Sequence, residues 1–430
     1  MNLTNKVLLG LVLGAIAGAI LNYFINSHNV MWLDTYVVDG ALLIGGKLFV
    51  NALKMLVVPL VIFSLIPGVF AIGDIKLLGK VGGKTIVLYI ATTAIAIATA
   101  ITLAAVLGIG EGGVPPEDID FTGRTAGKST IDIIIGIVPT NIFSAFASGD
   151  MLAIIFFSIF FGIAALSIKD ETEETVNFIG QMNKIVMQMV EMVMWFAPYA
   201  VFCLLGKAIA DVGIVLIVDL SSYFIVVITA LLVHAFVTQM FILKLFTGMK
   251  IKPFLSKIRS AQLFAFSTSS SGATIPVTLR TVQTRIGVDK AISSFSVPFG
   301  ATINMDGTAI MQGVATVFIA NLYGIELGME GYVLVVLTAV LASIGTAAVP
   351  SVGLVMLTLV FEQVNLPVAA IGLIMGVDRL LDMTRTAVNV TGDTVVTSIV
   401  AKSEGKLDMD IFNDPKAGQL EDLSLELTRK

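Results

Sequence analysis

The sequence is short of charge, of cysteine and of histidine, and each shortage excludes a class of protein. Only 13% of its 430 residues are Asp, Glu, Lys or Arg, whereas soluble domains have about 25%, so this is not a typical soluble domain. A net charge of −5 leaves no basic surface for nucleic acid. The one cysteine, Cys203, cannot form a disulfide within the chain, so it gives no information about the redox compartment. The two histidines, His28 and His234, are too few and too far apart to suggest a metal or haem site.

Apolar sequence is what the chain has in excess. Hydrophobic residues make up 56% of it and the mean hydropathy is +0.95, which predicts a membrane protein with several spans. Because His234 stands inside an apolar run, we interpret it as a packed or water-bonded core residue rather than a proton relay. The apolar segments fall at about 6–26, 39–73, 83–110, 129–168, 175–213, 216–246, 291–322 and 367–402.

Several of these segments exceed the length of about 20 residues that crosses the hydrocarbon core. The excess predicts tilted, kinked or broken helices, with Pro59, Pro67, Pro139 and Pro198 as candidate break points. The first segment follows Lys6 and resembles a signal peptide. It is long enough to span and no globular mature domain follows it, so we interpret it as the first transmembrane helix.

The distribution of lysine and arginine predicts the topology. Basic residues gather after the second segment, at 76–84, and after the sixth, at 244–259, while the loop between the first two segments has none. Since basic loops stay on the cytoplasmic side, eight crossings with both termini cytoplasmic fit this asymmetry, in a cell membrane. We expect the polar tail, residues 403–430, to be a solvated or weakly ordered cytoplasmic end.

Two stretches place hydroxyl, glycine and proline residues inside apolar sequence. One is Phe264–Pro276, with a serine-rich run, and the other is Ala342–Gly353. Paired small-residue breaks indicate a transporter binding site, because non-helical backbone at membrane depth is tolerated only beside protein or a water-filled cavity. Close packing of helices through small residues is the alternative interpretation.

The last apolar segment contains a polar stripe. At about 100° per residue, Asp378, Asp382, Arg385, Asn389 and Asp393 fall within an arc of about 80°. A charge at mid-bilayer costs about 2.5–3.5 kcal/mol on the lenient scale, so the stripe must face protein, water or ligand. Arg385 can bind a carboxylate bidentately and Asp382 can accept from an ammonium group. Asn389 and Asp393 could complete a cation site. The alternative is an internal Arg–Asp pair with no ligand.

The seventh span is interrupted by polar residues between Gly300 and Thr308. Asn304 and Asp306 would destabilise an unbroken lipid-facing helix. An unwound turn there would offer backbone carbonyls and the Asp306 carboxylate, which are hard oxygen ligands suited to an alkali cation. The alternative is a helix kink whose free amides are capped by Asp306.

Four motifs give the chain a family resemblance. STSSSGATIP (267–276), NMDGT (304–308), SIGTAAVP (343–350) and DMTRTAVNVTGD (382–393) closely resemble the dicarboxylate/amino acid:cation symporter family, which includes the excitatory glutamate transporters and archaeal sodium-aspartate transporters. The resemblance extends to about residue 405. It implies an all-α homotrimer with eight transmembrane helices, two re-entrant hairpins, inverted repeats and an elevator mechanism.

The resemblance also implies how the chain is divided. Spans 1, 2, 4 and 5, at 1–75 and 113–215, would form the trimerisation scaffold. Spans 3, 6, 7 and 8 with the two hairpins, at 76–112 and 216–402, would form the moving transport domain. The breaks at 267–276 and 343–353 would be the hairpin tips, the second acting as the extracellular gate.

Site residues follow from the same resemblance. Arg385 would bind the substrate side-chain carboxylate and Asp382 its amino group. The implied substrate-binding residues are Ser270, Thr308, Val349, Gly353, Asp382, Arg385, Thr386 and Asn389. One implied sodium site uses Gly300, Asn304, Asn389 and Asp393, another uses Ser343, Ile344 and Thr346 near Thr302, and a third uses Tyr89, Thr92, Thr93, Asn304 and Asp306.

The chain departs from the family pattern at two positions. Archaeal members have an arginine just before the hairpin serines, where this chain has Thr268, and animal members have it where this chain has Met383. Arg379, off the polar stripe, could substitute from one turn away. Asp378 receives no role.

The combination of Asp382 with Arg385 favours aspartate or glutamate as substrate. Sodium is the expected coupling ion, and no other cofactor is implied. Alternatives are a proton-coupled glutamate carrier, a C4-dicarboxylate symporter, or an ion channel built from broken helices. An intramembrane aspartyl protease would need two carboxylates that share a proton, whereas Arg385 would keep Asp382 ionised, so we expect no enzyme. The expected partners are a small acidic amino acid, sodium ions, lipids and two further copies of the chain.

Overall fold

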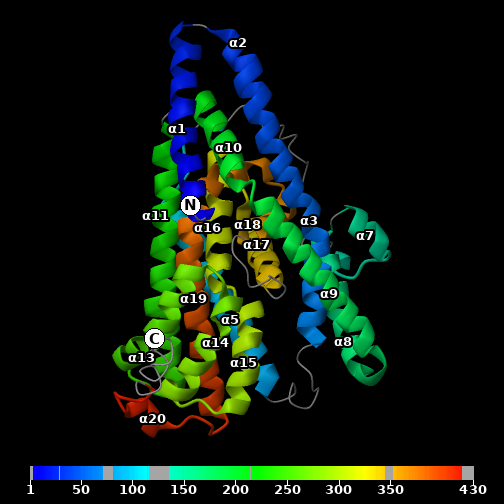
Figure 1. The fold of residues 1–430 in the computed structure, drawn as a ribbon, viewed down its shortest axis with the longest axis vertical. Coiled ribbons are helices and arrows are strands. Elements are labelled where there is room, and N and C mark those ends of the chain that lie inside the picture. Colours follow the sequence, from blue (N-terminus) through cyan, green and yellow to red (C-terminus); the bar gives the residue numbers. More distant parts are fainter. Residues whose placement is uncertain are drawn as a thin grey trace, which may run out of the picture.

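The computed structural model describes residues 3–28, 30–70, 81–113, 115, 135–148, 150–213, 215–343 and 352–418. Over these ranges the chain is helical, and the β contact found there is an isolated antiparallel bridge between Val288 and Leu407. Most of the helices are long and lie roughly along one axis (Figure 1). The predicted all-α class is therefore confirmed for the described ranges.

The first helix, α1 (Leu3–His28), lies along α10 (Ala197–Val212). Glycine makes the close approach possible, since a Cβ at Gly18 would lie 2.5 Å from the backbone oxygen of Gly206. Small residues let helix backbones approach where the surrounding solvent is lipid. Large apolar side chains of α1 are exposed, as a lipid-facing surface requires: Leu9, Val12, Leu13, Ile16 and Ile20.

Two of the four prolines expected to break helices do not do so. A short α2 (Met31–Leu33) and the π-helical η1 (Asp34–Leu42) lead into α3 (Leu43–Phe70). The helix α3 continues through both Pro59 and Pro67, so the predicted breaks there are wrong. Proline is tolerated inside apolar helices because neighbouring groups and local adjustments satisfy the freed backbone.

The other two prolines do mark helix boundaries. Pro139 lies in a non-helical stretch before α7 (Ile142–Ser148). Pro198 lies in the first turn of α10, where its missing N–H costs no hydrogen bond, just after α9 (Lys169–Met194). With α8 (Met151–Ser167), the helix α9 packs against α3 on one side of the bundle (Figure 1).

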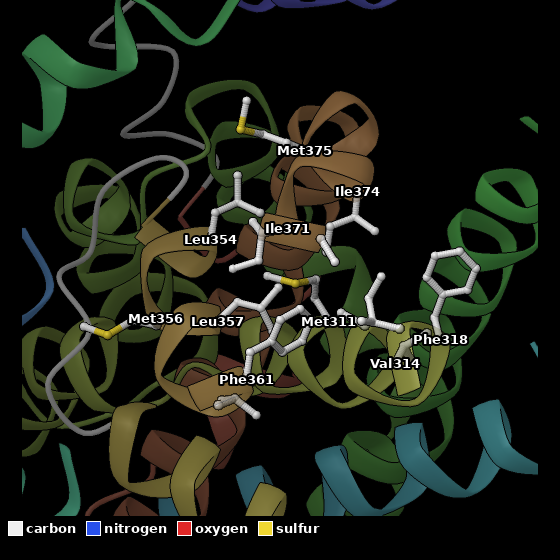
Figure 2. Close-up of a cluster of buried hydrophobic side chains, with 14 of the residues drawn as sticks. Met311, Val314, Phe318, Leu354, Met356, Leu357, Phe361, Ile371, Ile374 and Met375 are labelled. Carbon is white, nitrogen blue, oxygen red and sulfur yellow. The ribbon is translucent and has the colours of Figure 1, made fainter. Parts of the chain in front are cut away.

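The centre of the molecule is a group of buried helices around α16 and α19. Within α16 every residue except Asn321 is buried. Its apolar side chains pack against those of α18 and α19, as Met311, Leu357 and Ile374 illustrate (Figure 2). The central elements are α5 (Gly83–Val106), α11 (Val215–Val233), the π-helical η3 (His234–Thr238), α12 (Gln239–Thr247), α15 (Lys290–Ile303), α16 (Asp306–Leu322) and α19 (Ile371–Ser403).

Two helical hairpins pack beside this centre, at the two predicted breaks. The first hairpin is α13 (Ile251–Thr268) and α14 (Ser271–Thr281), followed by η4 (Val282–Ile286). The chain reverses at Ser269, whose φ of 52° ends α13 in the left-handed region. The second hairpin is α17 (Gly328–Ser343) and α18 (Val352–Gln363), followed by η5 (Val368–Ala370). Its tip, 344–351, lies outside the described residues.

The start of the polar tail is ordered, which differs from the expectation of a solvated end. The helix α20 (Met409–Asn413) buries Phe412 against the first hairpin. Lys257 Nζ lies 5.5 Å from the Phe412 ring centre and donates to the carbonyls of Arg285, Ile411 and Asp414. Burial lowers the pKa of the Lys257 ammonium. A buried aromatic ring and a three-fold ammonium contact thus hold a segment that composition alone marks as polar.

Three helices in the described part of the chain are long and apolar enough to cross a bilayer. They are Leu9–His28, Gly83–Val106 and Val218–Thr247. The helix α19 is longer, at 33 residues, but its polar stripe lowers its hydropathy. The predicted count of eight crossings is therefore not tested by helix length and composition.

Candidate functional site

The polar stripe of α19 is buried along its whole length. The five side chains predicted to share a face are between 1% and 7% exposed: Asp378, Asp382, Arg385, Asn389 and Asp393. The helix runs through the middle of the bundle, between α11, α12, α13, α15 and α16 (Figure 1). The prediction that this face is turned away from lipid is confirmed.

Arg385 contacts the first two acids of the stripe, Asp378 and Asp382. Its Nη2 donates to Asp382 Oδ1 at 2.8 Å, and its Nη1 lies 2.9 Å from Asp378 Oδ1. Arg379 joins from off the stripe, with Nη1 3.6 Å from Asp382 Oδ2. Two carboxylates and two guanidinium groups therefore form one cluster, here called the Arg385 cluster. Asp378, which had no role in the sequence, is a member of it.

Two neighbouring elements contact the Arg385 cluster closely. A Cβ at Gly353, in α18, would lie 3.2 Å from Arg385 Nη1 and 3.1 Å from Thr308 Cγ2. A Cβ at Gly307 would lie 2.6 Å from the backbone oxygen of Arg385. The structure thus brings together five of the residues predicted to bind substrate: Thr308, Gly353, Asp382, Arg385 and Thr386.

Two other predicted substrate residues are less well defined. Ser270 lies at the tip of the first hairpin, where its hydroxyl accepts from the backbone N–H of Ala273 and caps α14. Its contact with substrate stays a prediction. Val349 lies outside the described residues.

The chain unwinds between α15 and α16, as the sequence predicts. Asn304 and Met305 are non-helical, and Asp306 is the first residue of α16. The alternative of a kink capped by Asp306 does not describe the contacts. The amide of Gly307 instead donates to Asn389 Oδ1 at 2.7 Å, so α19 supplies a cap for the start of α16.

Asp306 is fully buried and each of its oxygens has partners. Oδ1 accepts from the Thr93 hydroxyl at 2.6 Å, and the Thr92 hydroxyl lies 3.5 Å away. Oδ2 accepts from Gln239 Nε2 at 3.2 Å and lies 3.0 Å from His234 Nε2. Two segments far apart in the sequence, α5 and the continuous helix of η3 and α12, therefore converge on one carboxylate. The Asp306 cluster is Asp306 with its four neighbours Thr92, Thr93, His234 and Gln239.

A second group of oxygens lies next to the Asp306 cluster. Asn304 Nδ2 donates to Asp393 Oδ1 at 3.0 Å and to the backbone oxygen of Asn389 at 3.3 Å. A Cβ at Gly300 would lie 2.5 Å from Asp393 Oδ1 and would also meet the Tyr89 hydroxyl, so only glycine fits there. The residues of two predicted sodium sites are thus adjacent, joined by Asn304, which lies 3.5 Å from the Thr92 hydroxyl. Hard oxygen donors of this kind suit an alkali cation.

The remaining predicted sodium site is only partly described. Thr302 donates to the backbone oxygen of Phe299, and Ser343 donates to that of Val340 at the end of α17. Ile344 and Thr346 lie outside the described residues. The joint role of this set stays a prediction.

His234 and Gln239 were not recognised as site residues from the sequence. The structure confirms that His234 is buried, but its partner is the Asp306 carboxylate rather than apolar core or water. Their spacing of five residues obscures a shared face on an α-helix. Between them η3 is π-helical, and i to i+5 spacing matches one wide π turn. Two polar residues in an apolar span were the available signal.

Nearly the whole sequence is similar to that of known proteins. Residues 3–403 match the family described as the sodium:dicarboxylate symporter family. The chain is 34% identical over 422 residues to the proton/sodium-glutamate symport protein of Bacillus caldotenax, covering 96% of each. It is 34% identical over 415 residues to the proton/glutamate-aspartate symporter of Escherichia coli, covering 94% of this chain and 93% of that protein.

A human protein is similar over nearly the same range. Excitatory amino acid transporter 2 is 33% identical over 460 aligned positions, which cover 92% of this chain and 78% of the human protein. The family match over residues 3–403 includes both hairpins, the break before α16 and the stripe of α19. The chain belongs to the sodium:dicarboxylate symporter family.

Proposed function

We propose that this protein is a secondary active transporter that imports aspartate or glutamate by symport with sodium. The observation that supports it best is the Arg385 cluster, in which a buried guanidinium and the Asp382 carboxylate lie side by side. An acidic amino acid has the matching pair of groups. Its side-chain carboxylate would bind Arg385 and its ammonium would bind Asp382.

The cluster also argues against the other substrates. A C4-dicarboxylate has no ammonium group to offset Asp382, so two like charges would meet in a buried site. A neutral amino acid has no side-chain carboxylate to bind the guanidinium of Arg385. The relatives named above support the acidic substrate, since their names refer to glutamate or aspartate.

Sodium would bind at the Asp306 cluster and at the oxygens of Asn304, Asn389 and Asp393. An alkali cation beside the two buried carboxylates would reduce the cost of burying them. Hydroxyl, carboxamide and carboxylate oxygens surround this turn, and they are the donor type that such a cation prefers. Proton coupling is the competing possibility, because the names of both bacterial relatives include protons, in one of them together with sodium.

The experiment that tests the proposal is uptake of labelled aspartate and glutamate into proteoliposomes. Three conditions are compared: an inward sodium gradient, an inward proton gradient, and no ion gradient. We expect accumulation with the sodium gradient only. Accumulation driven by the proton gradient without sodium would overturn the sodium assignment, and transport of succinate in preference to aspartate would overturn the substrate.

We further propose the homotrimer and the elevator motion of this family's architecture. The chain at 76–112 and 216–402, which includes the two hairpins, would move as the transport domain. The chain at 1–75 and 113–215 would form the scaffold, in a cell membrane with both termini cytoplasmic. The long packing of α1 on α10 is consistent with this division, because both helices lie in the proposed scaffold. Mass measurement of the protein in lipid nanodiscs tests the trimer.

A further inference from the structure

Asp378 is a buried acid that the proposed substrate and sodium sites do not use. It is 2% exposed and lies two helical turns before Arg385 on the same face of α19. Its Oδ1 is 2.9 Å from Arg385 Nη1, so Arg385 touches two carboxylates of its own helix. With Arg379 included, the Arg385 cluster has two positive and two negative groups and is formally neutral.

The contact between Asp378 and Arg385 is an ion pair of a particular kind. Neither oxygen of Asp378 has an aligned hydrogen bond within the described part of the chain, and Arg385 Nη1 has none either. One nitrogen meets one oxygen at the distance of an ion pair, so the contact is not bidentate. Asp378 therefore acts on Arg385 through charge more than through orientation.

The contact with Asp378 leaves the Nε of the same guanidinium without a partner among the described residues. A carboxylate can bind an arginine side-on, across Nε and Nη2, or end-on, across Nη1 and Nη2. Arg385 Nε is buried and has no hydrogen-bond partner among the described residues. Asp378 lies on Nη1 and Asp382 on Nη2, so a substrate carboxylate on the side-on edge would take Nε and share Nη2 with Asp382, while Asp378 stays in place.

The groups that compensate the charge of Arg385 therefore differ between the substrate-bound step and the substrate-free return step of a transport cycle. When substrate is bound, its side-chain carboxylate compensates Arg385 and its ammonium compensates Asp382. When the carrier returns without substrate, only carboxylates of the chain can compensate the guanidinium. Burying a charge without a counter-ion is strongly unfavourable, so the return step depends on what surrounds Arg385.

We propose that Asp378 is the resident counter-ion of Arg385, which makes the substrate-free return step possible at the cost of weaker substrate binding. The proposal rests on the function proposed above and deepens it. In this proposal Asp378 does not touch the substrate. It is a positioning residue that acts through the charge of Arg385. Its removal should therefore raise the affinity for the substrate and lower the rate of net uptake.

The test is Asp378→Asn, which keeps the side-chain size and removes the charge. We expect the Kd for aspartate of the purified protein to fall roughly tenfold, because substrate then meets one negative charge fewer. Net uptake into substrate-free proteoliposomes should fall by a factor of about ten or more, since it requires the return step. Exchange of external labelled aspartate for internal unlabelled aspartate, with sodium on both sides, should be retained because it avoids that step.

Two further variants serve as controls. Asp219→Asn removes a half-buried acid of α11 that lies outside the Arg385 cluster, and it should leave the ratio of net uptake to exchange unchanged. Asp378→Glu keeps the charge, and it should preserve the wild-type ratio even if folding of Asp378→Asn proves poor.

The outcomes separate the two proposals. If Asp378→Asn binds aspartate with a higher Kd and loses net uptake and exchange equally, Asp378 has a merely structural role and the counter-ion proposal is overturned. So would an unchanged ratio in Asp378→Asn, or a collapsed ratio in Asp378→Glu. If the wild-type protein itself neither binds nor exchanges acidic amino acids, the proposed function fails, whatever the variants do.

Discussion

Arg385 has a fully buried guanidinium, and the charge of its side chain should decide which substrates the protein accepts. Asp378 and Asp382 lie on its two terminal nitrogens, and Gly353 of the second hairpin faces Nη1. A side chain at position 353 would occupy space beside the guanidinium. Because the substrate ammonium would draw on the charge of Asp382, a side-chain carboxylate of the substrate would restore the balance around Arg385, so Arg385 should favour acidic substrates.

We predict that Arg385→Cys shifts selectivity from acidic to neutral amino acids. The variant removes the partner of the substrate side-chain carboxylate and leaves Asp382 for the ammonium group. Uptake of aspartate should fall by at least a hundredfold, on the order of the 3 kcal/mol that a charged hydrogen bond contributes, while serine or cysteine uptake appears. Competition uptake in proteoliposomes measures both. A variant that still imports aspartate and ignores serine contradicts the role of Arg385.

The Asp306 carboxylate gives a second prediction at this scale. In Asp306→Asn the anion is lost, while the neighbouring hydroxyls of Thr92 and Thr93 remain. We expect the sodium concentration for half-maximal aspartate binding to rise at least tenfold. A sodium titration of aspartate binding provides the measurement, and Glu330→Gln, at an exposed position of α17, provides the matched control. An unchanged sodium dependence would remove Asp306 from the cation site.

At the scale of the element, Lys257 connects the first hairpin to the segment around α20. Its ammonium donates to three backbone carbonyls, one in η4 and two in the segment around α20. Each buried carbonyl left without a donor costs about 1–3 kcal/mol. The hairpin base therefore depends on a residue that the sequence presents as one of several loop lysines.

We predict that Lys257→Met lowers the thermal stability of the protein, whereas Lys252→Met, which changes an exposed lysine about one and a half turns away on the same helix, does not. The free energy of unfolding should fall by about 2–4 kcal/mol, because the substitution removes a charged donor from several carbonyls at a partly buried position. Thermal unfolding of the detergent-solubilised protein gives the comparison. Equal melting temperatures for the two variants would mean that the chain end contributes nothing to the hairpin.

The elements also show which features a sequence can predict. The stripe of α19 follows from helical periodicity and the cost of charge in lipid, and the breaks at 269–270 and 304–305 follow from hydroxyl, glycine and acidic residues in apolar sequence. The partner of His234 does not, because Asp306 is 72 residues away and a π-helical turn sets the side of the helix. Nor does the continuity of α3 through Pro59 and Pro67, which depends on what surrounds each freed carbonyl.

At the scale of the whole molecule, the predicted cation sites join segments from all parts of the sequence. Residues of α5, η3, α12, α15, α16 and α19 meet between Asp306 and Asp393. A ligand that binds only the folded arrangement stabilises it by about 2.7 kcal/mol at a hundred times its Kd. Binding at this junction should therefore be felt by the entire fold.

We predict that sodium with aspartate raises the melting temperature of the protein, and that choline with aspartate does not. The effect should disappear in Asp306→Asn, because the variant lacks the carboxylate that joins α5, η3 and α12 to α16. Thermal unfolding in the two salts at equal ionic strength is the measurement. A shift of equal size in choline would mean that aspartate binds without a cation.

The small number of histidines has one more consequence. His28 is exposed at the end of α1 and His234 is buried against Asp306, so the protein has two imidazoles in very different surroundings. Labelling of histidine alone with nitrogen-15 would then give two sets of magnetic resonance signals, one of which comes from the predicted cation site. That natural probe, 3.0 Å from the carboxylate, would report cation binding without any mutation.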